Sequence, residues 1–218
     1  GWDAVAFNYR GCSGEPNRVL QMYHSGKTED LHLVINHVLS TRKYKTLTLV
    51  GFSLGGNLTL KYAGEMGKKI PKQVKSAIGI SAPCDLASSV EEILKFKNRI
   101  YEKRFLQTLI KKVKQKEPLF TSNISRNYSQ VKNLADFDHY YTAPMHGFAS
   151  AKDYWESCSS RKFISNTAVP LLILNAKDDP ILGPECFPYN EARESRKIFL
   201  EVPEQGGHVG FISFNDRG

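Results

Sequence analysis

The sequence contains little cysteine. The chain has 218 residues and only four cysteines, Cys12, Cys84, Cys158 and Cys186, and no two of them form a C-x-x-C pair. This spacing excludes a zinc-finger framework, and a chain of this size does not depend on disulfides for its core. We therefore expect four reduced thiols and a cytoplasmic location, with membrane association left open.

Long hydrophobic runs are also missing. No apolar stretch approaches the roughly 20 residues that span a bilayer, and the first residues lack the basic-then-apolar pattern of a signal peptide. The sequence contains no Walker loop, no dinucleotide glycine fingerprint and no metal-ligand cluster. It therefore predicts no cofactor and no metal. The balance of 41% hydrophobic and 24% charged residues is that of a globular protein with a sizeable core.

The net charge of +8 comes from one stretch. Residues 95–116 contain nine lysines and arginines and a single acidic residue, Glu102, and the rest of the chain is neutral overall. No nucleic-acid motif accompanies this charge, so nucleic acid is not an expected partner. Two interpretations remain open for the basic stretch: a solvated helix face, or a face that docks on an anionic membrane.

Strand and helix patterns alternate along most of the chain. Short apolar, β-branched runs predict strands, and apolar residues at helical spacing predict helices. The predicted strands are 4–9, 46–52, 74–82, 169–176 and 197–202, and the predicted helices between them include 28–42, 57–66 and 184–195. Thr28 is the expected cap of the first helix. This alternation indicates an α/β fold with a mostly parallel sheet flanked by helices.

The alternation is interrupted between residues 84 and 168. This insertion lies between two predicted strands and contains helical patterns at 89–96 and 99–116, so we expect a helical cap within a single domain covering 1–218. Ser88 with Glu91, or Ser89 with Glu92, forms an expected capping box. One apolar face is predicted for the two helices, made of Ile93, Phe96, Ile100, Leu106, Leu109, Ile110 and Val113. Six aromatic residues of the insertion could line a pocket or simply form core: Phe137, Tyr140, Tyr141, Phe148, Tyr154 and Trp155.

The most specific motif is the pentapeptide Gly51-Phe52-Ser53-Leu54-Gly55. This G-x-S-x-G pattern stands between a predicted strand and a predicted helix, the setting of a nucleophile elbow. The glycines allow strand and helix to approach closely, and the turn presents the Ser53 hydroxyl. The backbone N–H of Leu54 is the expected oxyanion donor.

A serine nucleophile needs a base, and the base needs an acid that orients it. Of six histidines, His208 is the preferred base because it lies in a glycine-flanked loop after the last predicted strand. Asp178 and Asp179 follow the strand before it, and we prefer Asp179 because it lies deeper in the loop. Asp85 is a rival because it follows the third strand.

Together these motifs resemble the YheT-like α/β-hydrolases, a family that includes the abhydrolase-domain 1 and 3 proteins and plant embryogenesis-associated relatives. The matching stretches are 8–18, 23–26, 51–57, 142–148, 175–180 and 206–211. The resemblance implies Ser53 as nucleophile, Asp179 as acid and His208 as base, in the family's chain order.

The resemblance also implies a carboxylic ester hydrolase of the esterase or lipase type, acting on acyl esters or lipids through an acyl-enzyme. Two alternatives remain: an alcohol O-acyltransferase with the same three residues, and a non-catalytic binding module on a hydrolase scaffold. The chain begins at what resembles the fourth strand of the family and ends soon after His208. The earliest strands and a second oxyanion donor are therefore expected to be missing.

Overall fold

The computed structural model describes residues 1–212, which form two compact units. One unit joins residues 1–24 to 99–154, and the other joins residues 25–98 to the chain from 155 onward. The helices are α1 (Thr28–Thr41), α2 (Leu54–Met66), α3 (Leu86–Ile93), α4 (Arg99–Lys114), α5 (Leu134–Phe137), α6 (Ala143–His146), α7 (Ala151–Cys158), α8 (Arg161–Ile164) and α9 (Tyr189–Glu194). Among these residues no helix has both the length and the apolar character needed to cross a lipid bilayer.

The second unit contains a parallel sheet. Its strands are β1 (Leu47–Phe52), β2 (Val74–Ile80), β3 (Leu171–Leu174) and β4 (Ile198–Glu201), in the order β1-β2-β3-β4. The register aligns Gly51 with Gly79 and Gly79 with Ile173. All four strands end at the same edge of the sheet, where parallel α/β proteins build their sites. The predicted parallel α/β architecture is confirmed.

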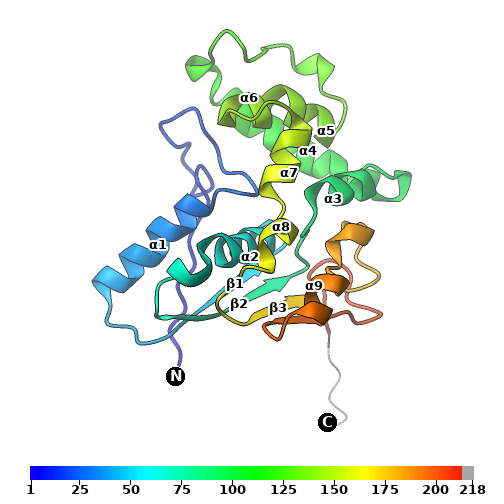
Figure 1. Ribbon diagram of the computed structural model, residues 1–218. Coiled ribbons are helices and arrows are strands. Elements are labelled where there is room, and N and C mark those ends of the chain that lie inside the picture. The colour runs from blue at the N-terminus through cyan, green and yellow to red at the C-terminus, as the bar shows by residue number, and fades with distance from the viewer. Residues whose placement is uncertain (213–218) are drawn as a thin grey trace. The chain divides into compact units, whose positions relative to one another are not determined.

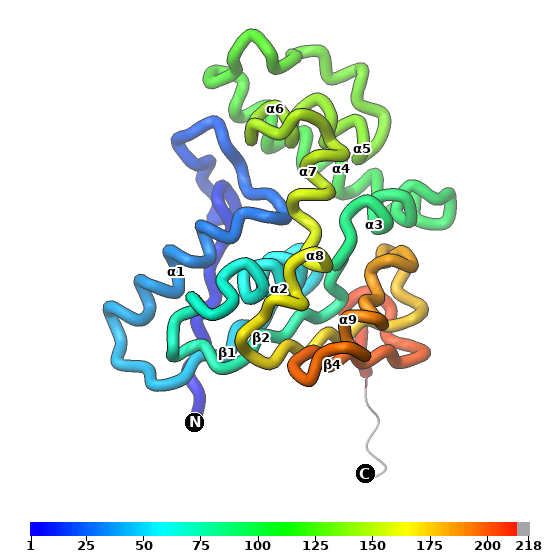
Figure 2. Tube along the Cα trace, in the orientation of Figure 1, coloured from blue at the N-terminus to red at the C-terminus, as the bar shows by residue number. Residues whose placement is uncertain are grey.

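Helix α2 covers the sheet. It packs on β1 and β2, and α1 and α8 lie on either side of it (Figure 1). Helix α9 packs beside β4 (Figure 2). Leu60 and Tyr62 of α2 are fully buried, as are Ala77 of β2 and Ile173 of β3. Val50, Phe52 and Phe199 are each more than half exposed, so part of the sheet stays uncovered. The strands were recognisable in the sequence from their short apolar runs.

Two predicted helix caps are wrong. Lys27 is the N-cap of α1 and its side chain makes no capping bond, whereas the Thr28 hydroxyl donates to Glu65 (2.6 Å). Helix α3 begins at Leu86, and the Asp85 carboxylate accepts the N–H of Ser88 (2.9 Å). The predicted capping box fails because the helix starts before the serines that would cap it.

Residues 4–9 do not form the predicted strand. Among the described residues they carry no strand assignment. Their aromatic side chains pack on one another instead: Phe7 meets the Tyr9 ring edge-on at 5.6 Å between centroids, and Tyr9 stacks on Tyr23 at 5.5 Å. An apolar, aromatic sequence favours a strand, but only a neighbouring strand can supply its hydrogen bonds.

The first unit has a hydrophobic core of its own. Helix α4 contributes Val113, which is fully buried, together with the partly buried Leu106, Leu109 and Ile110. The prediction that Phe96 and Ile100 share this face is wrong, because they are 85% and 84% exposed. Phe96 precedes the helix, and Ile100 lies on the side of α4 opposite Val113 at 100° per residue. The predicted cap over 84–168 and the single domain over 1–218 remain predictions.

Candidate active site

Ser53 lies at the turn between β1 and α2. It is the N-cap of α2, with φ of 50° and ψ of −121°, a backbone conformation that side-chain-bearing residues rarely adopt. Its N–H donates to the carbonyl of Ile80 at 2.9 Å, which ties the turn to the end of β2. Such strained residues persist where the surrounding structure holds them, and they concentrate at functional sites. The strand–turn–helix setting predicted for the motif is therefore present.

Gly51 allows the close approach that this turn needs. A β-carbon at this position would lie 2.0 Å from the carbonyl oxygen of Gly55 and 2.7 Å from the backbone nitrogen of Gly56. Backbone atoms at that distance cannot rotate away, so the first turn of α2 would have to shift.

We expect Gly51→Ala to lower the free energy of unfolding by about 1–3 kcal/mol or more, the range found for overpacked sites. Urea unfolding followed by circular dichroism measures this change. An unchanged midpoint would contradict this prediction. It would show that the first turn of α2 can move away from the new β-carbon at little cost in free energy, despite the 2.0 Å approach.

Three side chains from three different loops meet beside this turn. The Nε2 atom of His208 lies 2.9 Å from the Ser53 hydroxyl oxygen, and its Nδ1 atom lies 3.0 and 3.1 Å from the two carboxylate oxygens of Asp179. The Asp179 side chain is fully buried and that of His208 is 15% exposed. With Nδ1–H donating to the carboxylate, Nε2 is left to accept the Ser53 proton. The arrangement can therefore generate a serine nucleophile.

The two neighbouring aspartates have different partners. Asp179 accepts the N–H of Ile181 at 2.9 Å as well as the imidazole. Asp178 accepts the N–H of Gly207 at 2.8 Å and so supports the loop that carries His208. The structure thus places Asp179, the aspartate preferred from the sequence, beside His208 and gives Asp178 a different partner.

The other candidate groups have structural partners. Asp85 caps α3, so this rival acid is already used. His32 is hydrogen-bonded to the Tyr62 hydroxyl at 3.0 Å, as expected of a helix residue, and His24 and His146 pack ring to ring at 4.5 Å in the other unit. The four cysteines, which all lie in the described part of the chain, form no disulfide, and burial raises the pKa of the Cys84 thiol to about 12.

Two residues that support the site were not among those singled out from the sequence. The Ser81 hydroxyl, after β2, accepts the N–H of Val209 at 3.0 Å and so holds the residue next to His208. Asn175, after β3, is fully buried and bonds both the N–H (2.8 Å) and the carbonyl (3.0 Å) of Ala82. The available hints for Asn175 were its polar side chain at the end of an apolar strand and its place in the matching stretch 175–180.

Leu54, the expected oxyanion donor, is the first residue of α2. The first N–H groups of a helix have no intrahelical acceptor, and the helix dipole favours negative charge there. The Leu54 N–H is therefore of the right type, and it follows Ser53 directly, as an oxyanion donor at a nucleophile elbow does.

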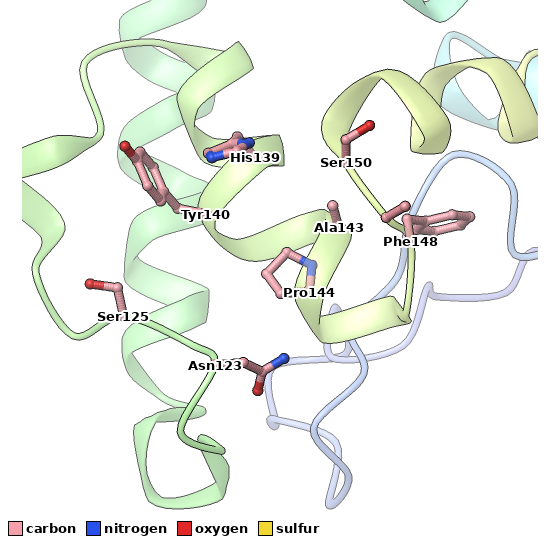
Figure 3. A pocket seen from close by; sticks show the side chains of 9 residues that line it. Asn123, Ser125, His139, Tyr140, Ala143, Pro144, Phe148 and Ser150 are labelled. Atoms are coloured by element: carbon pink, nitrogen blue, oxygen red, sulfur yellow. The ribbon is translucent and has the colours of Figure 1, made fainter.

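A cavity of about 210 Å³ lies in the first unit (Figure 3). It is lined by Asn123, Ser125, His139, Tyr140, Ala143, Pro144, Phe148, Ala149 and Ser150. Two of the aromatic residues considered for a pocket, Tyr140 and Phe148, therefore border a cavity, whereas Phe137 and Tyr141 belong to the core cluster. None of Ser53, Asp179 and His208 lines it.

The parallel sheet, its covering helices and the turn at Ser53 are those of an α/β-hydrolase. The chain belongs to the family described as the alpha/beta hydrolase fold, which matches residues 1–214. The protein YheT of Escherichia coli (strain K12) is 34% identical over 97% of this chain and 62% of its own length. The mouse phospholipase ABHD3 is 29% identical over 97% of this chain and 52% of its own length.

Among solved structures, an esterase of Pyrococcus furiosus superposes with a TM-score of 0.55. It is 14% identical and covers 94% of this chain and 62% of its own. At 14% identity, this similarity shows a shared fold and nothing more. The narrower resemblance to YheT-like proteins is confirmed by the relatives named above. The chain spans between about half and three fifths of their length.

Proposed function

We propose that the protein hydrolyses carboxylic esters of acyl or lipid substrates, with Ser53 as nucleophile, His208 as base and Asp179 as the acid that orients it. The observation that carries this proposal is the chain of contacts from the Ser53 hydroxyl through His208 to the buried Asp179 carboxylate. The name of the mouse relative, a phospholipase, supports a lipid acyl ester as the substrate class.

The proposed reaction has two halves. The Ser53 oxygen attacks the ester carbonyl carbon while Nε2 of His208 takes its proton, and the Leu54 N–H stabilises the oxyanion. The C–O bond to the alcohol then breaks, and His208 returns the proton to the leaving alkoxide. This leaves an acyl group on Ser53.

In the second half, water attacks the acyl-enzyme with His208 again as base. The acid is released and Ser53 regains its proton. Throughout, Asp179 keeps the imidazole in one tautomer and stabilises its positive charge. An alcohol in place of water would transfer the acyl group, which is the alternative reaction of the same residues.

The test combines covalent labelling with turnover. A fluorophosphonate probe should phosphonylate Ser53, as read by intact mass and peptide mapping, and p-nitrophenyl esters of increasing chain length should be hydrolysed. Added ethanol should not divert most of the acyl group into ethyl ester. A folded protein that is neither labelled nor active on any ester would contradict the proposal and favour a binding module.

A further inference from the structure

The outer face of α4 differs from the rest of the basic stretch. Of the nine basic residues, Lys95 and Lys97 form ion pairs with Glu92, at 2.5 and 2.8 Å. Lys112 donates to the carbonyl of Gly11 at 2.6 Å, and the buried Lys116 donates to the carbonyls of Asn17 and Val19. These four cations serve the structure of their own units, and so does Lys114, whose Nζ atom lies 5.0 Å from the centre of the Tyr128 ring.

The remaining cations of α4 point outward. Arg99, Lys103, Arg104 and Lys111 are exposed, and none of them has an ion-pair partner in the part of the chain that is described. Glu102 is the one acidic residue of α4, and its Oε1 atom is buried. The outer face of the helix therefore presents positive charge without a nearby negative charge of its own.

Apolar side chains lie on and beside this outer face. Ile100 is 84% exposed in its middle, and Tyr101, 100° further round the helix, is 47% exposed at its edge. Ile100, Arg104 and Lys111 lie in one row, since residues four and seven apart share a helix face. The opposite side of α4 packs on the core of the first unit, beside α5 (Figure 1). A helix anchored on one side, with exposed apolar and basic residues on the other, has the composition of an interfacial helix.

We propose that the outer face of α4 docks on an anionic lipid bilayer, with the helix parallel to the membrane plane. Arg99, Lys103, Arg104 and Lys111 lie at the level of the lipid phosphates, while Ile100 and Tyr101 enter the boundary between head groups and acyl chains. A second copy of this chain is a poor partner because two such faces repel each other. Duplex nucleic acid offers the opposite charge but no apolar layer for Ile100.

The charge half of this proposal is tested by vesicle co-sedimentation. Each lysine or arginine near an anionic surface strengthens binding about five-fold. The triple variant Lys103→Gln, Arg104→Gln, Lys111→Gln should therefore partition on the order of 100-fold more weakly onto vesicles of phosphatidylcholine with phosphatidylserine. The matched control is Lys68→Gln, Lys69→Gln, Lys72→Gln, which removes the same charge from exposed positions of the other unit and should bind like the unchanged protein.

A separate variant tests the contribution of the apolar side chains to docking. Ile100→Ser should weaken partitioning about ten-fold, because the isoleucine side chain loses its transfer into the interface. Raising the salt from about 0.1 M to about 1 M, which shortens the Debye length from about 10 to 3 Å, should release most of the protein. Circular dichroism of each variant checks folding, and these positions are exposed, so the fold should persist.

Several outcomes would overturn the docking proposal. These are equal binding to vesicles of phosphatidylcholine alone, an equal loss in the control triple variant, no effect of Ile100→Ser, or tighter binding to a random-sequence DNA duplex than to the vesicles. The readout does not depend on catalysis, so Ser53→Ala should dock like the unchanged protein. Failure of docking and failure of the proposed ester hydrolysis are therefore distinguishable.

Discussion

Replacing Ser53 by alanine is expected to lower ester turnover by on the order of 10⁶-fold, the cost of removing a serine nucleophile that acts as a unit with its base. The hydroxyl oxygen lies 2.9 Å from Nε2 of His208, so its loss leaves the imidazole without a proton to accept. Initial rates with a p-nitrophenyl ester at saturating concentration measure the effect on kcat.

The Ser53→Ala variant also separates chemistry from folding. Alanine keeps the β-carbon, so the positive φ of 50° and the bond from the residue 53 N–H to Ile80 are unchanged. We expect the free energy of unfolding to change by no more than about 0.5 kcal/mol. Labelling by a fluorophosphonate should vanish with the activity. Retained turnover together with intact folding would assign the nucleophile to another residue.

Replacing Asp179 by asparagine is expected to lower kcat by about 10⁴-fold. The asparagine side chain is nearly isosteric, but its NH₂ group can donate to Nδ1 and so favours the wrong imidazole tautomer. The residue is buried and its carboxylate contacts both His208 and the Ile181 N–H, so solvent cannot replace it. Steady-state kinetics should show the loss in kcat more than in KM.

Asp178→Asn is the matched control for this prediction. Asp178 neighbours Asp179 in sequence, and its carboxylate accepts a backbone bond from the Gly207 N–H at 2.8 Å. An asparagine oxygen can accept the same bond, so we expect turnover close to that of the unchanged protein. Equal losses in the two variants would mean that loop support, and not orientation of the imidazole, limits the reaction.

Local patterns were sufficient for much of the fold and the site. The strands β1, β2, β3 and β4 were predicted within a few residues of their observed ends, because short apolar runs bounded by turn residues favour strands. The turn at Ser53 was also predicted from the sequence. A G-x-S-x-G pentapeptide between a strand and a helix is typical of a nucleophile elbow. His208 was found from its loop after the last strand.

Contacts between segments far apart in the sequence could not be predicted in this way. His208 lies 155 residues from Ser53 and 29 from Asp179. Only the order and register of the strands bring their loops together. The roles of Ser81 and Asn175 depend on the same meeting of loops. The wrong prediction of a strand at 4–9 has the same cause. A strand needs hydrogen bonds from a neighbouring strand, and the residues of 4–9 do not specify that neighbour.

The sequence by itself therefore determined the parallel α/β architecture, the family resemblance, and the positions of Ser53 and His208, because short-range periodicity and turn chemistry act within a few residues of the chain. The sequence favoured Asp179 over Asp178, and the tertiary structure gives the physical difference between them, since the Asp179 carboxylate lies beside His208 and that of Asp178 beside the Gly207 N–H. The tertiary structure alone decided which basic residues are bound internally and which remain on the outer face of α4. That division depends on where the chain places a carboxylate or a carbonyl beside each lysine, as it does for Lys95 and Lys116.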